Sequence, residues 1–420
     1  MKIIADLHIH GRHSQATSKD LTIPNLEKYA KIKGLNLLGT GDFTHPEWIK
    51  HIKENLTDDG SGILKTKSGF NFMLQTEISL IYSQGGSGRR IHNVVLAPSL
   101  DAVEGITNYL LSKGRIDYDG RPIFKIPCPE FVESLRSISK DIEVIPAHIW
   151  TPWFGMLGSK SGFDSISECF QDQTKHIHAI ETGLSSDPAM NWRLSQLDKF
   201  SIVSFSDLHS FWPWRIGREA TVFDMNNLTY KNIINSLKEN TVDSTIEFWP
   251  EEGKYHFDGH RNCNVCLDPK DTMKVKGICP KCGKPLTIGV AYRVEELADR
   301  EPGYKPNNAK PFTNIIPLSE IISGSINKAV ATKAVWEIYN QLIDKFNNEI
   351  NILFNVSKED LSKVVEPKIA DLIIKNREMK IKVKPGYDGM YGIPVLDETE
   401  IKEEEKFIPK FEQKGLGDFI

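Results

Sequence analysis

The feature that most constrains the fold of this chain is a pattern repeated along its first 250 residues. Short apolar runs typical of buried strands alternate there with stretches of helical periodicity, and nearly every apolar run carries a His, Asp or Glu at one end. Strands that alternate with helices favour a parallel sheet covered by helices, either an open sheet or a barrel. The carboxyl ends of such strands converge, so we expect one site to gather Asp6, His8, His10, Asp42, His45, Glu77, His92, His148, Glu181, Asp207 and His209.

The segment DLHIH, close to the start of the chain, shows the pattern at its densest. Successive side chains of a β-strand point to opposite faces, so Asp6, His8 and His10 should share one face. Taken alone, the segment fits an edge strand with a polar side equally well. The other strand ends favour a shared site.

The number of imidazole and carboxylate side chains in this set predicts a multinuclear metal centre. Each residue alone has an ordinary explanation as a hydrogen-bonded structural residue, but so many in register exceed the needs of one structural ion. Imidazole and carboxylate together suit Zn²⁺, Mn²⁺ or Fe²⁺. Two or more metals close together are the usual means of hydrolysing phosphate esters, because they stabilise both the attacking and the leaving oxygen.

A second metal site is predicted by four cysteines with the spacing C-x2-C-x12-C-x2-C, namely Cys263, Cys266, Cys279 and Cys282. Four thiolates leave no open coordination position, so we expect one structural zinc ion in a ribbon, with the nearby His260 as a spectator. Residues 254–292 contain seven Lys or Arg against three Asp. Beside a phosphoesterase site this local excess favours a phosphodiester backbone as substrate; a lysine-rich soluble surface is the alternative.

Composition sets further limits. With 420 residues there is room for two or three domains, and a formal net charge of −4 means that nucleic-acid binding needs a local basic patch. The start MKIIADLHIH lacks the apolar core of a signal peptide, and no apolar run approaches the length of a membrane span. We therefore expect a cytoplasmic protein, associated with the nucleoid in a prokaryote, with no membrane partner.

The end of the chain carries a short motif behind a charged stretch. Its spacing, Q-x-x-L-x-x-F-I, resembles the peptide by which DNA repair and replication enzymes bind the sliding clamp, and it comprises Gln413, Leu416, Phe419 and Ile420. One turn of 3₁₀ helix would place the three apolar side chains on one side, as a plug for an apolar pocket. The alternative is an ordinary frayed end.

The strand-end motifs resemble those of the polymerase and histidinol phosphatase (PHP) superfamily, on the strength of DLHIH, GTGDFTH, the strand-ending Glu77, IPAH and SFSDLHS. The resemblance implies a distorted (β/α)7 barrel with a trinuclear metal centre that hydrolyses phosphoesters, and the ligands His8, His10, Glu77, His92, His148, Asp207 and His209. The second motif departs from the family, where Asp and His are adjacent, because Phe43 follows Asp42 here. We still expect both Asp42 and His45 to bind metal.

Candidate residues for handling a phosphate lie close to these motifs. We expect Asp207, His148 and Arg218 to act in catalysis, with Arg215 and Arg218 clamping a phosphate through bidentate hydrogen bonds. Pairing of these arginines with Glu219 or another nearby acid is the alternative.

Further candidates surround the predicted site. Glu181 could orient a ligand histidine, and His13 is a candidate extra ligand. Aromatic side chains near the site could stack on a base or wedge a duplex, or belong to the core; they are Trp150, Trp153, Phe154, Trp212 and Trp214.

The order of these parts resembles the endonuclease Q family. It predicts a PHP barrel over residues 1–250, a four-cysteine zinc ribbon over 251–295, a helical DNA-binding region over 296–396, and a flexible tail with the clamp-binding peptide over 397–420. The resemblance implies a DNA endonuclease that hydrolyses the phosphodiester 5′ of uracil, hypoxanthine or xanthine, or at abasic sites. It also implies two or three divalent metals in the barrel (Zn, Mg, Mn or Fe), one structural zinc in the ribbon, damaged DNA and the sliding clamp as partners, and a monomer.

Two alternatives stay open. A small-molecule phosphatase of the histidinol-phosphate type would share the barrel and its metals, but it would have no use for a zinc ribbon or a clamp-binding peptide. A non-catalytic DNA-binding scaffold would be expected to have lost metal ligands, whereas the predicted set is almost complete here.

Overall fold

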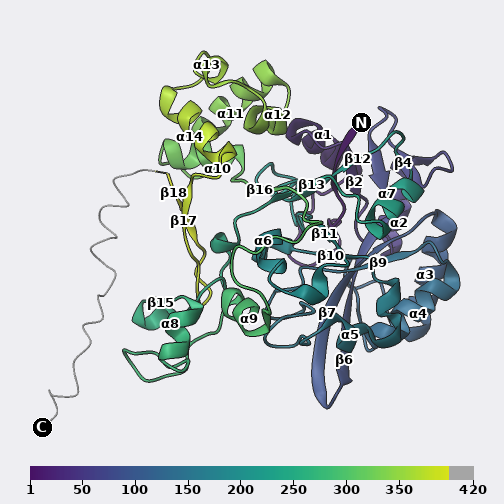
Figure 1. Ribbon diagram of the computed structural model, residues 1–420. Helices are drawn as coiled ribbons and strands as arrows, with labels where there is room; N and C mark the ends of the chain where they lie inside the picture. Colours follow the sequence, from purple (N-terminus) through teal and green to yellow (C-terminus); the bar gives the residue numbers. More distant parts are fainter. Residues whose placement is uncertain (397–420) are drawn as a thin grey trace, which may run out of the picture.

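An eight-stranded sheet lies at the centre of the N-terminal half (Figure 1). The computed structural model describes residues 1–396, so the predicted clamp-binding peptide lies outside the described residues. Strand β1 (Lys2–Asp6) runs inside the sheet, parallel to β2 (Leu37–Gly39) and antiparallel to β12 (Ala220–Asp224). The outer strands are β13 (Ser244–Glu247) and β16 (Phe312–Asn314) beyond β12, and β5 (Asn71–Met73), β4 (Ile63–Lys65) and β3 (Thr57–Asp58) beyond β2.

A second sheet is built around a long antiparallel hairpin of β6 (Gln75–Gln84) and β7 (Ser87–Leu96). Strand β8 (Ile123–Phe124) pairs with β6, and β9 (Glu143–Pro146) pairs with β7. In Figure 1 this hairpin is the long blue ribbon that projects from the lower edge of the body. A short parallel pair, β10 (Ala179–Glu181) and β11 (Ser201–Val203), completes the strands around the candidate site.

Helices cover these sheets, and their ends follow the capping rules. Helix α1 starts at Ile23 behind Thr22, whose side chain accepts a hydrogen bond from the Asn25 amide, and it ends at Gly34 in the left-handed conformation. The helices of this half are α1 (Ile23–Lys33), α2 (Pro46–Asn55), α3 (Leu100–Lys113), α4 (Cys128–Ile138), α5 (Ile166–Phe170), α6 (Pro188–Asn191) and α7 (Tyr230–Lys238).

The mixed α/β class predicted from the sequence is confirmed, but the strand directions are less uniform than predicted. Strand β12 enters the central sheet antiparallel to both β1 and β13, and β6 and β7 form an antiparallel hairpin. A hairpin needs only a tight turn and no crossover helix, so alternation of strands and helices could not reveal it. The pairings of residues 1–396 spread the strands over several sheets, and closure into a seven-stranded barrel stays a prediction.

A small ribbon follows the α/β body. It contains the hairpin of β14 (Asp258–His260) and β15 (Val265–Leu267), then α8 (Pro269–Lys274). Its apolar core is only Val265, Cys279 and Leu286, with a few half-buried neighbours. So small a core favours stabilisation by a metal. Helix α9 (Val290–Leu297) leads back to the body, where the Arg293 side chain donates to the carbonyl oxygens of Leu157 and Phe163.

The helical group beyond residue 317 is attached to the body by a buried ion pair. Lys33 of α1 lies 2.7 Å from a carboxylate oxygen of Glu349, and both side chains are fully buried. Figure 1 shows this group, in yellow-green, above the small module that contains β15 and α8. Its helices are α10 (Leu318–Ser325), α11 (Lys333–Phe346), α12 (Glu349–Phe354), α13 (Lys358–Leu361) and α14 (Pro367–Arg377). Among residues 1–396, no helix has both the length and the apolar character needed to cross a membrane.

A final strand pair joins the helical group to the ribbon. Strands β17 (Lys382–Lys384) and β18 (Ile393–Val395) run down from the helices toward the ribbon in Figure 1. At the turn between them, the Thr287 hydroxyl donates to Asp388 over 2.6 Å, and the Tyr387 hydroxyl lies 2.9 Å from Asn264 Oδ1. A β-carbon on Gly392 would approach the Glu251 carbonyl oxygen to 2.1 Å, so glycine permits this close passage.

Candidate metal centres

The first candidate site gathers side chains from separate segments of the α/β body. His8 and His10 follow β1, Glu77 lies in β6, and Asp207 follows β11. One possible ligand atom from each of these four residues lies within 4.8 Å of the others. The Oε2 atom of Glu77 is 3.2 Å from Nε2 of His10 and 3.5 Å from Nε2 of His8.

Glu77 connects this group to a second one, formed with His92 of β7 and with His148, which follows β9. Its other oxygen, Oε1, lies 2.7 Å from Nδ1 of His92 and 3.2 Å from Nε2 of His148. One carboxylate thus presents a different oxygen to each group of imidazoles, as a bridge between two metal positions would. We call the six residues the imidazole–carboxylate cluster: His8, His10, Glu77, His92, His148 and Asp207.

Three of the imidazoles are held from behind by a hydrogen-bond partner. Glu181 lies 2.9 Å from Nδ1 of His8, Asp42 lies 3.0 Å from Nδ1 of His10, and the Thr151 hydroxyl lies 2.9 Å from Nδ1 of His148. Such a partner fixes the tautomer and leaves the other ring nitrogen, Nε2, as the free ligand atom. The role predicted for Glu181, orienting a histidine, agrees with this contact.

The donor set of the cluster suits divalent metal ions. The Nε2 atom of His8 is buried and has no hydrogen-bond partner within residues 1–396. A buried polar atom without a partner is costly, and a metal ion would satisfy it. Imidazole nitrogen with carboxylate oxygen is a ligand set for Zn²⁺, Mn²⁺ or Fe²⁺, so the residues present fit the predicted ions.

The backbone around the cluster is strained at three non-glycine residues. Asp42, His148 and Asp207 have φ angles of 39°, 30° and 47°. Such left-handed conformations are unfavourable for residues with a β-carbon and persist only where the surroundings impose them. Two of these residues, His148 and Asp207, belong to the cluster, and Asp42 is the hydrogen-bond partner of His10. The fold therefore accepts backbone strain at the positions that place these side chains.

Opposite charges dominate the electrostatics of the cluster. Burial by itself would raise the pKa of Glu77, but its interactions with His92, Arg121 and His8 outweigh burial and hold that pKa well below its usual range. Burial likewise opposes ionisation of Asp207, yet His8 and His10 keep its pKa well below the ordinary value. Both carboxylates are therefore anionic at neutral pH.

The imidazoles respond to the same charges. Burial would lower the pKa of His8, but Glu181 and Glu77 raise it well above its ordinary value. Burial lowers the pKa of His92 to about 4, so this ring is neutral. A metal ligand must be a neutral imidazole, so metal binding would displace the proton that His8 carries.

Asp6, Asp42, His45, His13 and His209 lie outside the imidazole–carboxylate cluster. Asp6 accepts hydrogen bonds from the backbone amides of Ser206 and Gly217, and burial raises its pKa to about 6. It ties β1 to the segment before β12 instead of facing the metal positions. Asp42 approaches Nδ1 of His10, the nitrogen opposite the cluster, while its second oxygen accepts from the Gly11 amide and the Ser14 hydroxyl.

The predicted ligands His45 and His209 are also displaced from the cluster. His45 precedes helix α2, and its ring stacks on that of His13 at a centroid distance of 4.3 Å. Phe43 and Thr44 separate Asp42 from His45 along the chain, so the His45 ring does not lie beside His10, the hydrogen-bond partner of Asp42. His209 has its ring centroid 4.6 Å from that of His10 and its Nδ1 3.0 Å from the Asp207 carbonyl oxygen. It lies beside the cluster, half exposed.

The cluster opens into a cleft of about 940 Å³, which we call the active-site cleft. Its walls include His148, Asp207, His209, Arg215 and Arg218 from the body, with Tyr255, Tyr391 and Leu396 from the ribbon and the last strand pair. Arg218 is buried, and its guanidinium donates to the Ser206 carbonyl oxygen over 3.2 and 3.3 Å. Burial lowers its pKa to about 10, which leaves it charged at neutral pH. Within residues 1–396 it forms no ion pair with Glu219.

Arg121 contacts the imidazole–carboxylate cluster, a contact that the sequence does not predict. Arg121 donates from Nη1 to Oε2 of Glu77 over 3.1 Å. It belongs to the irregular segment before β8, where no apolar run or strand end marks it. A motif search therefore had no signal for it.

The aromatic candidates divide between core and surface. Trp150 is fully buried and donates from Nε1 to Asn191 over 2.8 Å, so it belongs to the core. Trp153 is 41 % exposed and lines the active-site cleft. Trp212 and Trp214 stack on each other at a centroid distance of 5.4 Å, and the ring centroid of each lies within 6 Å of that of Trp336 in the helical group.

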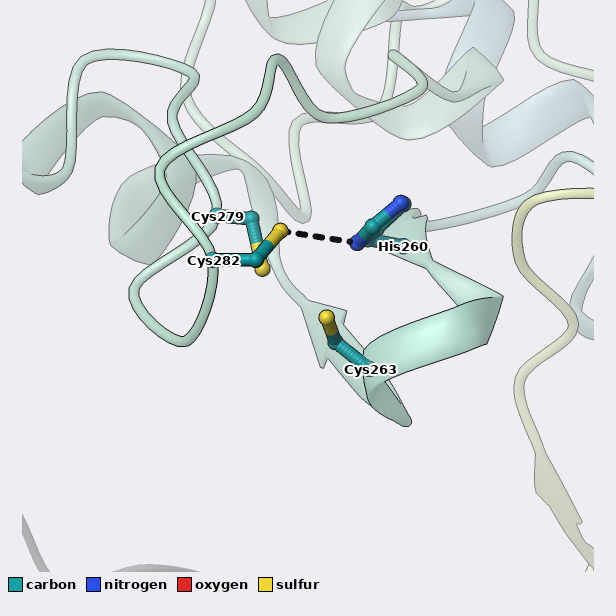
Figure 2. A group of neighbouring side chains, drawn as sticks. All are labelled: His260, Cys263, Cys279 and Cys282. Atoms are coloured by element: carbon teal, nitrogen blue, oxygen red, sulfur yellow. Dashed lines mark hydrogen bonds between the residues drawn. The ribbon is translucent and has the colours of Figure 1, made fainter.

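The second candidate metal site lies in the ribbon and differs from the predicted one by a single residue. Figure 2 shows the imidazole of His260 facing the sulfurs of Cys263, Cys279 and Cys282. One ligand atom from each of these four residues lies within 4.8 Å of the others, and Nδ1 of His260 is 3.4 Å from the Cys282 sulfur. We call these four residues the ribbon cluster. His260, predicted to be a spectator, is in this group and Cys266 is not; the four-cysteine site stays a prediction beside it.

Cys263 and Cys266 hold different positions in the β14–β15 hairpin. Cys263 lies in the turn before the strand, whereas Cys266 pairs with Gly259 inside the β14–β15 ladder. The Cys266 side chain is exposed. Burial would raise the pKa of Cys279, but hydrogen bonds from the amides of Lys281 and Cys282 lower it to about 6. Hydrogen bonding with Cys282 raises the pKa of Cys263, another member of the ribbon cluster, to about 11, so the lowered pKa belongs to Cys279 and not to the whole cluster.

Comparison with known proteins places the whole chain among relatives of known structure. A crystal structure of a lesion-specific endonuclease from Pyrococcus furiosus matches with a TM-score of 0.85 and 30 % identity, covering 97 % of this chain and 99 % of that one. A structure of endonuclease Q in complex with a 27-mer duplex substrate that has an abasic lesion at the active site matches with a TM-score of 0.84 and 30 % identity, over 96 % and 98 % of the two chains.

Curated relatives give a consistent result. The protein YqxK of Bacillus subtilis is 30 % identical over 93 % of this chain and 98 % of its own length. The protein MJ0043 of Methanocaldococcus jannaschii is 35 % identical over 58 % of this chain, but the match spans only 31 % of that longer protein. Residues 317–380, which hold the helical group, match the family model described as the MJ0043 C-terminal domain.

Proposed function

The chain belongs to the endonuclease Q family of metal-dependent nucleases, and from this premise we propose that it nicks damaged DNA at the phosphodiester 5′ of the lesion. The lesions proposed are uracil, hypoxanthine, xanthine and abasic sites. The observation that carries the proposal is the double contact of Glu77, which faces two groups of imidazoles. Two residues of these groups, His148 and Asp207, line the active-site cleft.

We propose that the imidazole–carboxylate cluster holds two or three divalent metal ions, with Glu77 shared between two of them. When bound, such ions supply water of lowered pKa and positive charge for the phosphate oxygens. Asp42, Glu181 and Thr151 orient the ring nitrogens toward the metal positions. In the ribbon, a zinc ion held by one imidazole and three thiolates would have no open position and would serve the fold alone.

The active-site cleft provides the remaining parts of the reaction. Arg215 and Arg218 lie on its wall and would bind a phosphate through guanidinium N–H groups, in Arg218 through those that remain beside its two hydrogen bonds to the Ser206 carbonyl oxygen. Trp153, Tyr255 and Tyr391 line the same cleft and offer ring faces to a base turned out of the duplex. A lesion that pairs weakly is the cheapest to turn out, which gives a physical basis for lesion selectivity.

We further propose that the C-terminal peptide binds a sliding clamp. This part of the proposal rests on the sequence of Gln413, Leu416, Phe419 and Ile420, which lie outside the described residues. Deletion of residues 413–420 should leave nicking of a short duplex unchanged and remove any stimulation by a clamp loaded on circular DNA. Stimulation that survives the deletion would contradict this role.

The experiment that tests the main proposal uses end-labelled duplexes with the purified protein in Mg²⁺, Mn²⁺ or Zn²⁺. The duplexes carry a single deoxyuridine, deoxyinosine or abasic site, with an undamaged duplex as control and p-nitrophenyl phosphate assayed in parallel. We expect one nick, 5′ of the lesion, and none in the control. Phosphate release from the small ester with intact DNA would favour a phosphatase. Binding of DNA without any cleavage would favour a scaffold.

A further inference from the structure

A second, strongly basic groove adjoins the active-site cleft. It has a volume of about 720 Å³ and runs between the β6–β7 hairpin, the start of α4 and the loop of residues 153–161. Trp153 lines both the groove and the active-site cleft, so the groove begins where that cleft ends. Four of the residues that line it are cationic: Arg89, Arg90, Lys125 and Lys160. We call this cavity the basic groove.

The charge of the basic groove is not neutralised locally. No Asp or Glu is among its lining residues in the described part of the chain. Arg90, Lys125 and Lys160 are exposed, and within residues 1–396 none of them forms an ion pair. These four cations therefore form an uncompensated positive surface in a chain of net charge −4, and such a surface suits an anionic partner.

The walls of the groove are held in place by contacts that lead directly to the imidazole–carboxylate cluster. The Arg89 guanidinium lies 4.0 Å from the Phe163 ring centre and donates to the Gly162 carbonyl oxygen. The Phe154 carbonyl oxygen accepts from the His92 amide over 2.9 Å, and the ring centroids of these two residues are 4.3 Å apart. The groove is thus a preformed feature at a fixed position relative to His92.

We propose that the basic groove binds the sugar–phosphate backbone of the DNA that flanks the scissile phosphodiester. This proposal rests on the proposed function and adds the path by which DNA leaves the active-site cleft. A row of exposed cations suits phosphate contacts, which position a duplex without reading its sequence. The exposed ring of Trp153, at the junction, would separate the lesion in the cleft from the flanking backbone in the groove.

The test compares the parent protein with the triple variant Arg90→Gln, Lys125→Gln and Lys160→Gln. Binding to an undamaged duplex is measured by fluorescence anisotropy over a range of salt concentrations, so that no cleavage interferes. Each lost phosphate contact lowers the slope of log K against log salt by about 0.9, so we expect the slope to fall by about 2 to 3 and affinity at 0.1 M salt to fall about tenfold or more.

A matched control carries the same change of charge elsewhere. Lys67→Gln, Lys140→Gln and Lys238→Gln replace exposed lysines that line neither cavity, and this variant should keep the parental slope. Equal loss in both triple variants, or a parental slope in the groove variant, would overturn the proposal, because the charge of the groove would then have no specific part in binding.

Nicking assays on the same proteins separate this proposal from the proposed function. Two abasic duplexes are used, one trimmed on the 5′ side of the lesion and one trimmed on the 3′ side. For the parent, trimming the flank that occupies the groove should raise KM, and for the groove variant it should make no difference. If the parent nicks but no flank shows this dependence, the groove proposal fails alone. If the parent does not nick lesion DNA, the proposed function fails, and the salt slopes still decide whether the groove binds a duplex.

Discussion

The two candidate metal clusters differ in almost every physical property. The imidazole–carboxylate cluster is largely buried, combines nitrogen with oxygen donors, and has a hydrogen-bond partner behind three of its rings. The ribbon cluster is half exposed, relies on three sulfurs, and sits in a module whose apolar core has three buried residues. We expect the surrounding structure to hold the first cluster without metal, and the ribbon, with its small core, to depend on an ion for stability. We infer that metal loss should stop chemistry in one and unfold the other.

The largest effect should follow from breaking the link between the two groups of imidazoles. Glu77→Gln removes the negative charge that faces His10 on one side and His92 on the other. We expect nicking of an abasic duplex to fall to the detection limit, with fewer bound metal ions per chain by mass spectrometry. Thermal unfolding serves as the control, because the variant must stay folded. A variant that is folded, binds fewer metals and nicks at the parental rate would show that the cluster is not the catalytic site.

A smaller effect should follow from removing a partner behind the cluster. Glu181→Gln weakens the hold on Nδ1 of His8, and we expect a loss of about 10- to 100-fold in metal affinity or in kcat/KM for nicking. Glu143→Gln is a matched control, because Glu143 is also buried and lies 2.9 Å from Nδ1 of a histidine outside the cluster, His178. Equal losses in both variants would mean that Glu181 matters only for stability.

The smallest effect on nicking should come from the ribbon. We expect Cys263→Ser and His260→Ala to lose one zinc per chain and to expose the ribbon to protease, whereas Cys266→Ser keeps both zinc and protection. Nicking should fall only by as much as DNA binding weakens. Retention of zinc in His260→Ala together with its loss in Cys266→Ser would restore the four-cysteine site predicted from the spacing.

Much of the imidazole–carboxylate cluster could be predicted from the sequence because its members end or follow apolar runs. His8, His10, Glu77, His92, His148 and Asp207 all come from that pattern, and the structure brings them together. Asp42 and His45 were expected beside them on the same grounds. Two residues separate these along the chain, and the local geometry places Asp42 behind His10 and turns His45 toward His13.

In the ribbon, the sequence predicts that a site exists but leaves one of its ligands undecided. The cysteine spacing predicts a metal site in the ribbon, yet it cannot choose between Cys266 and His260 as the fourth ligand. The choice depends on which side chain of the β14–β15 hairpin faces the turn that carries Cys279 and Cys282, and that follows from the hairpin register. Spacing along the chain does not contain that information.

By itself, the sequence determined the α/β class and predicted two candidate metal sites of different chemistry, with the residue types that make up each. Strand periodicity and ligand spacing are local properties, so they can be read along the chain. Only the tertiary structure decided that Arg121 meets Glu77, that His260 lies with Cys263, Cys279 and Cys282, and that Trp153 lines both the basic groove and the active-site cleft. These contacts join segments that are distant in sequence, and the packing of the whole chain is what brings them within reach of each other.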